Sequence, residues 1–154
     1  MDYFIMQTDS RLRRLPQLRI PKELLNMGDT EQIKSKEAVP VIYVKGNMGL
    51  SIEYPDYIER PIPLIAEKLH KILKKYQQDT AFYQVVLIEK DTGKQKVYYM
   101  MLPPIIACTD KPKTVYNRIF RVQELKNQIV VRLDVAESIL RRDANGIWFE
   151  PLKF

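Results

Sequence analysis

The stretch that decides the fold is residues 118–151, RIFRVQELKNQIVVRLDVAESILRRDANGIWFEP. Ile119 to Val122 is a short apolar run, which predicts a strand, and the run that starts at Gln128 predicts another. Asp134 can cap a following helix with Glu137 as its capping-box partner. Asn145-Gly146 is a typical helix end, and residues 147–152 predict a final strand. The stretch contains no group of residues arranged for catalysis.

Residues 3–8, 39–45, 50–54, 82–89, 96–102 and 105–108 have the apolar, β-branched and aromatic character of strands. Lys90-Asp91-Thr92-Gly93 predicts a hairpin, with Gly93 supplying a positive φ. Residues 9–37 are polar and are interrupted by proline, so they predict a loop with short helical turns. Local hairpins rather than βαβ alternation therefore predict a single α+β domain over residues 1–154 with a mainly antiparallel sheet.

Residues 63–77 predict one long amphipathic helix. Its apolar side chains recur at helical spacing, and Pro63 suits the first turn. The opposite side of this helix carries the lysines Lys68, Lys71, Lys74 and Lys75. The C-terminal helix after Asp134 is expected to be shorter.

The composition is that of a globular protein, with 45% hydrophobic and 29% charged residues in a chain of 154. The net charge of +6 permits an acidic protein partner, nucleic acid or an anionic membrane surface, but it selects none of them. The most basic local cluster is Arg11, Arg13, Arg14 and Arg19. Solvated loop arginines and an anion-binding site are both consistent with it.

The sequence lacks the residues that several kinds of chemistry require. Cys108 is the single cysteine and His70 the single histidine, so the sequence offers neither an intramolecular disulfide nor a zinc site. No phosphate-binding glycine loop or nucleophile motif is present. The acids Glu53, Asp56 and Glu59 keep an enzyme open as an alternative. We expect no catalytic residue, no cofactor and no metal.

Targeting signals are also missing from the sequence. No run approaches the ~20 apolar residues that cross a bilayer. The N-terminus lacks the basic start of a secretory signal peptide, so a cytoplasmic location is expected.

Tyrosines gather in two places. Tyr54 and Tyr57 lie in a proline-rich connection beside acidic and basic residues, and Tyr98 and Tyr99 follow one another on an expected strand. Tyrosine and arginine are common at the centres of protein interfaces. Packing in the core is the other reading of the same tyrosines.

The order of several motifs resembles the imm-eleven family, immunity proteins of bacterial polymorphic toxin systems that were formerly a domain of unknown function. The matching motifs are PxPLIxxKLxxIL over Pro61–Leu73, FYQVVL from Phe82, IFRV from Ile119, DVAESIL from Asp134 and GIWFEPL from Gly146. They cover roughly residues 52–154. Residues 1–50 match only in opening with an aromatic strand, so they form a variable N-terminal part.

The resemblance implies a non-enzymatic cytoplasmic protein that binds and neutralises a cognate toxin domain. The positive charge suggests an acidic patch on that toxin. No role of the family's residues transfers to individual positions, so the candidate contact residues come from charge and aromatic character. They are Arg11, Arg13, Arg14, Tyr54, Tyr57, Lys68, Lys71, Lys74 and Lys75. A nucleic-acid-associated basic protein and an interaction domain of another kind remain alternatives, and the oligomeric state stays open.

Overall fold

The structure is a computed structural model that describes residues 2–28, 39–46, 49, 51–76, 79–107, 117–126 and 128–153. The chain folds as a mixed α and β domain that is mostly sheet. In sequence order its described elements are β1 (Tyr3–Thr8), β2 (Gln17–Arg19), α1 (Lys22–Gly28), β3 (Val41–Lys45), β4 (Tyr57–Ile58), β5 (Leu64–Ala66), α2 (Glu67–Leu73), β6 (Ala81–Glu89), β7 (Gln95–Leu102), β8 (Ile105–Ile106), β9 (Ile119–Val122), the 3₁₀ helix η1 (Gln123–Leu125), β10 (Gln128–Arg132), α4 (Leu133–Arg141) and β11 (Ile147–Leu152).

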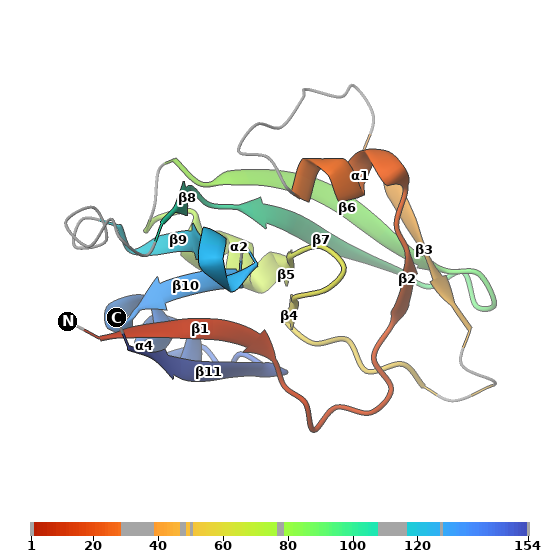
Figure 1. The fold of residues 1–154 in the computed structure, drawn as a ribbon. Coiled ribbons are helices and arrows are strands. Elements are labelled where there is room, and N and C mark those ends of the chain that lie inside the picture. Colours follow the sequence, from red (N-terminus) through yellow and green to blue (C-terminus); the bar gives the residue numbers. More distant parts are fainter. Residues whose placement is uncertain are drawn as a thin grey trace.

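The described strands form two sheets instead of the one that the sequence predicted. Sheet A has the order β11-β1-β10-β9-β8, and sheet B has the order β2-β3-β6-β7-β5-β4. In sheet A, β1 lies between β10 and β11, which brings both ends of the chain together (Figure 1). Among the described pairs, β3 with β6 and β8 with β9 are parallel, and the others are antiparallel.

The largest core cluster joins the two sheets. Met6 and Val131 of sheet A pack with Ile65 and Met101 of sheet B, and α2 and α4 add buried side chains. A second cluster fills the space between α1 and the other face of sheet B, and a third lies on the other face of sheet A. Burial of apolar side chains in these clusters is the main force that holds the sheets together.

The predicted long helix over residues 63–77 is wrong. Leu64–Ala66 is strand β5, which pairs with β7, and α2 spans only Glu67–Leu73. Leu64 and Ile65 are both completely buried, and as neighbours on a strand they point into different core clusters. A short apolar run fits a buried strand as well as a helix, so the tertiary packing decided between them. Pro63 does not begin a helix, and its carbonyl accepts the Met101 N–H at 3.0 Å.

Three other local predictions also need correction. Helix α4 ends at Arg141, so Asn145-Gly146 does not end it, although Gly146 has a positive φ. Asp134 lies inside the first turn of α4 and not at its cap, and its carboxylate accepts two hydrogen bonds of 2.8 Å from Arg132. Residues 51–54 are irregular, although residues 50–54 were predicted as a strand. Leu50 and Cys108 lie outside the described residues.

The predictions for three strands and one turn are confirmed. Strands β1, β9 and β11 have the predicted bounds, and Gly93 turns the β6–β7 hairpin with φ +72°. No helix in the described residues is long and apolar enough to cross a membrane.

Candidate partner-binding surface

Arg11 is held by a forked ion pair just beyond the end of β1. Its guanidinium donates to Asp9, with Nη2 2.7 Å from Oδ2 and Nε 3.0 Å from Oδ1. The backbone N–H of Arg11 also donates to Asp9 Oδ1, and these hydrogen bonds hold the pKa of the Asp9 carboxyl below its usual range. Because both planar groups are fixed in this fork, the exposed Arg11 side chain keeps one orientation.

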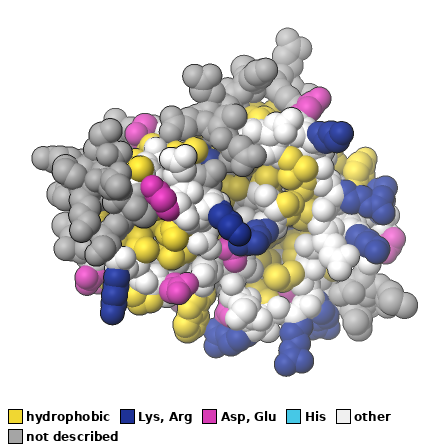
Figure 2. Space-filling view, in the orientation of Figure 1, with side chains coloured by type: hydrophobic (Ala, Val, Ile, Leu, Met, Phe, Trp, Pro, Cys, Tyr) yellow, Lys and Arg dark blue, Asp and Glu magenta, His cyan; other side chains and the backbone are white. Residues whose placement is uncertain are grey.

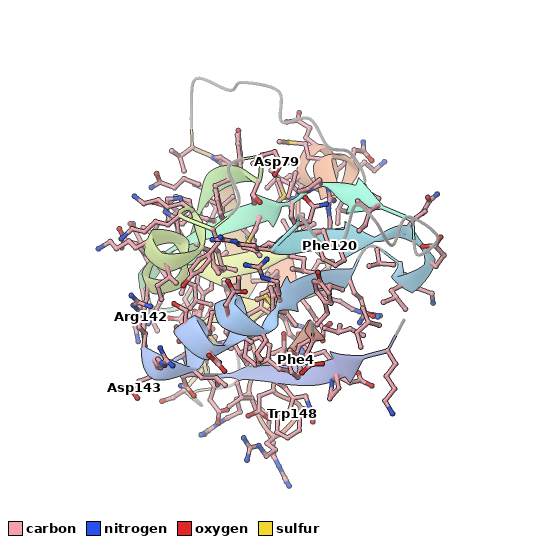
Figure 3. The ribbon with its side chains drawn as sticks, turned by 90° about the vertical axis from the view of Figure 1, so that its left-hand side faces the viewer. Phe4, Asp79, Phe120, Arg142, Asp143 and Trp148 are labelled. Carbon is pink, nitrogen blue, oxygen red and sulfur yellow. The ribbon has the colours of Figure 1, made fainter. Side chains whose placement is uncertain are left out.

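The Arg11 guanidinium lies over an exposed tryptophan. Its Cζ is 5.9 Å from the ring centroid of Trp148 on β11, a cation–π arrangement. Trp148 pairs with Gln7, and its side chain is 53% exposed on the face of sheet A opposite α4 (Figure 3). The sequence predicted a final strand over residues 147–152. Trp148 lies in that strand, and about half of it is left in solvent on this face.

Two surface hollows flank this pair. One, of about 440 Å³, lies between the start of β11 and the end of α4 and is lined by Leu140, Ala144, Ile147 and Trp148 together with Asp9 and Arg11. Leu140 is 58% exposed. The other, of about 360 Å³, lies on the side of Thr8, Ser10 and Glu59. The surface thus combines an exposed aromatic ring, an exposed aliphatic side chain and a fixed cation around a depression.

Hydrogen bonds fix the loop that joins α4 to β11. The Asn145 N–H donates to Asp56 Oδ2 at 2.6 Å, and the Asp56 N–H donates back to the Asn145 carbonyl at 2.7 Å. Lys68 Nζ donates to the carbonyl of Asp143 at 2.7 Å, and the N–H of Asp9 donates to Gly146 O at 2.9 Å. The loop is therefore tied to β1, to the start of β4 and to α2.

The four predicted lysines divide into two kinds. Lys68 is bonded to the α4–β11 loop through the Asp143 carbonyl. Lys71 is exposed on α2, and Lys74 and Lys75 are exposed in the turn that follows it. Figure 3 shows Arg142 and Asp143 at the end of α4 next to α2. The loop that closes the larger hollow therefore begins beside α2, and Lys68 is the lysine that contacts it.

The structure separates the remaining candidates. Tyr57 is buried, with 2% of its surface exposed, so it packs in the core and cannot contact a partner. Burial raises the pKa of its hydroxyl far above the usual value. Tyr54 is half-buried beneath Lys96, whose Nζ lies 5.0 Å from the ring centroid. Partial burial raises the pKa of Tyr54 to about 12, and the negative charge of Glu89 contributes a smaller part of this shift.

The loop arginines beyond Arg11 are less firmly placed. Arg13 is exposed, and Arg14 makes one contact of 3.4 Å with Glu53. Figure 2 shows basic side chains gathered toward the right and lower margins of one face, with apolar side chains between them. Sequence reasoning missed Trp148 and Leu140 as surface residues because an apolar side chain carries no local sign of whether other elements will cover it.

His70 directly precedes the exposed residues Lys71, Lys74 and Lys75, which together form the lysine face. The titration of His70 provides a test of the fold. Its ring stacks on Tyr99 at a centroid distance of 3.8 Å, and Phe82 meets it edge-on at 4.8 Å. Partial burial, with a further contribution from Lys74, lowers the pKa of His70. The folded protein therefore binds a proton at His70 less readily than the unfolded chain does.

We expect the free energy of unfolding to fall as the pH drops below about 6.5, the ordinary pKa of histidine. The loss continues until the pH reaches the lowered pKa of the folded state. His70 is the only histidine, and most carboxylates titrate below pH 5, so this window reports on one group. Urea unfolding at several pH values measures it. A His70→Phe variant keeps an aromatic ring in the stack and should be nearly independent of pH in the same window. If the free energy of unfolding of that variant depends on pH as strongly as that of the original protein, a group other than His70 causes the dependence.

Protein-family models and curated proteins give no further guide to this surface. The chain matches no protein-family model, and no curated protein matches it. Within the described ranges, no three His, Cys, Asp or Glu side chains gather as metal ligands would.

Proposed function

We propose that this chain is a cytoplasmic, non-enzymatic immunity protein of the imm-eleven type that binds and neutralises a cognate bacterial toxin domain. The observation that carries the proposal is the exposed pair of Arg11 and Trp148 beside the hollow that Leu140 borders. Tryptophan and arginine contribute most of the binding energy at many protein interfaces. The choice of a toxin as the partner rests on the order of motifs in residues 52–154, which resembles that of the immunity proteins.

The anatomy of this surface suits a protein partner. An apolar centre with a polar or charged rim is typical of protein interfaces. Here Trp148 and Leu140 supply the apolar part of the lining, and Asp9, Arg11 and Asn145 supply the polar part. The hydrogen-bonded α4–β11 loop is fixed before binding, which reduces the entropy that a partner must overcome.

Co-expression with the toxin domain encoded by the neighbouring gene tests the proposal. Cells that make the toxin alone should stop growing, and cells that also make this chain should grow. The two proteins should co-purify as a stable complex. If growth is not restored and no complex forms, the proposed function is wrong.

The lysine face should set the rate of encounter with an acidic toxin. Changing Lys71, Lys74 and Lys75 together to Glu should slow association about tenfold or more at low salt, because long-range attraction becomes repulsion. The dissociation rate should change little, and the difference should shrink at high salt. Stopped-flow fluorescence or surface plasmon resonance measures both rates.

A matched control uses three basic residues on the β6–β7 hairpin of sheet B. Changing Lys90, Lys94 and Lys96 to Glu alters the net charge by the same amount at exposed positions away from α2. We expect a much smaller effect on association. Equal slowing by both variants would mean that overall charge, and not the lysine face, guides the encounter.

One observation favours a second candidate, nucleic-acid binding. Tyr43 on β3 is 44% exposed, and Lys90 Nζ lies 4.8 Å from its ring centroid. Arg19 pairs with Tyr43 on the neighbouring strand β2. Bases stack on exposed aromatic rings flanked by cations. A titration with single-stranded RNA at increasing salt tests this candidate, which predicts affinity that falls steeply with salt. Absence of binding at low salt would exclude it.

A further inference from the structure

Strand β11 is an edge of sheet A. It pairs with β1, and in the part of the chain that the structure describes no strand pairs with its other side. It runs along the lower margin of the molecule in Figure 1. An edge strand presents a row of backbone donors and acceptors that another strand can use.

The pattern of hydrogen bonds between β1 and β11 shows which backbone groups of β11 face outward. The Asp9 N–H donates to Gly146 O, and the register pairs Thr8 with Ile147. In an antiparallel ladder, residues alternate between pointing their backbone groups at the partner and away from it. Trp148 and Glu150 therefore bond to β1, whereas Ile147, Phe149 and Pro151 point their backbone groups away from the sheet.

Pro151 limits the row of outward donors. It has no N–H, and proline at such a position is a common protection against unwanted strand pairing. The N–H groups of Ile147 and Phe149 remain available, in the half of β11 that borders the larger hollow. The protection thus covers the end of the strand away from the hollow and leaves the end beside it open.

We infer that the toxin domain adds a short extended segment to the edge of β11 along Ile147–Phe149. This inference rests on the proposed function. The added backbone would exchange hydrogen bonds with Ile147 and Phe149, as in other complexes formed by strand addition. Because side chains alternate along a strand, neighbouring residues of the segment would point alternately to the Leu140 side and the Trp148 side of the sheet.

A foreign acidic segment fits this edge better than a second copy of the chain. Two copies that placed Ile147 opposite Phe149 would bring Pro151 opposite Asn145, whose N–H is already bonded to Asp56, so that register cannot extend further. Two molecules of charge +6 also repel each other. A foreign segment can use the carbonyl of Pro151 as well, and acidic side chains on it would be attracted.

Amide hydrogen exchange on the complex with the neighbouring toxin domain is the direct test. When the toxin is bound, the amides of Ile147 and Phe149 should exchange at about one tenth of their free rates or below, because they gain hydrogen bonds. The amides of Trp148 and Glu150 already bond to β1 and serve as internal references. If the toxin binds and both outward amides keep their free rates, strand addition is wrong and the proposed function stands. If the toxin does not bind at all, the proposed function itself fails.

A pair of variants tests the same hydrogen bond independently. Phe149→Ala and Phe149→Pro lose the same ring, but only the proline removes the outward N–H. Pro151 shows that β11 accepts a proline at an outward position. The proline variant should bind the toxin about tenfold more weakly than the alanine variant, and equal affinities would contradict the inference. If the proline variant does not fold, exchange on the unmodified chain decides. Sedimentation of the free protein should show a monomer, since dimers that Phe149→Pro abolishes would make a second copy the occupant.

Discussion

Replacing Gly146 by alanine is expected to destabilise the protein by about 2–5 kcal/mol. The residue has φ +77°, a left-handed conformation that costs an L-amino acid about 1–2 kcal/mol. An added Cβ would also collide with the Pro55 Cβ and lie 2.8 Å from the Pro55 Cα. Overpacking of this kind costs a further ~1–3 kcal/mol. The midpoint and slope of urea unfolding measure the change.

Pro55 cannot easily move to make room. The Tyr98 hydroxyl donates to the Pro55 carbonyl at 2.7 Å inside the core, and the next residue, Asp56, is bonded to Asn145. Gly93→Ala is the matched control, because Gly93 has φ +72° but no atom within 4 Å of an added Cβ. It should lose only the conformational part, about 1–2 kcal/mol. Equal losses in the two variants would show that the contact with Pro55 is relieved by movement.

Replacing Trp148 by alanine is expected to weaken toxin binding by about 2–4 kcal/mol, or about 30- to 1,000-fold in Kd. The ring is large, exposed and held beneath Arg11, so a partner can bury it with little loss of entropy. Folding should suffer far less, by under about 1 kcal/mol, because half of the ring is already in water. Isothermal titration calorimetry measures the affinity and urea unfolding measures the stability.

Tyr43→Ala provides the control for this experiment. Tyr43 is also a half-exposed aromatic residue under a cation, but it lies on β3 of sheet B. Toxin affinity should remain within about threefold of the original, as for a residue outside the interface. The opposite pattern, with strong loss at Tyr43 and none at Trp148, would move the binding surface to sheet B.

Residues with a strong local pattern were predictable. Ile119–Val122 and Ile147–Leu152 are strands with the expected bounds, because their apolar residues are bounded by turn-forming residues. Arg11 was predicted as a contact residue from its charge and is exposed beside Trp148. Leu64 and Ile65 were misassigned because their local pattern fits a helix, whereas burial on two faces requires a strand.

The sequence by itself determined the α and β composition, the turn at Gly93 and the positive φ at Gly146, because these depend on residues close together in the chain. Only the tertiary structure decided that the strands form two sheets, that Tyr57 is buried and that Trp148 is exposed. Those outcomes depend on which distant segments pair. Trp148 is half exposed because its side chain stands on the face of sheet A opposite α4, whereas its neighbours Ile147 and Phe149 pack against the core on the other face.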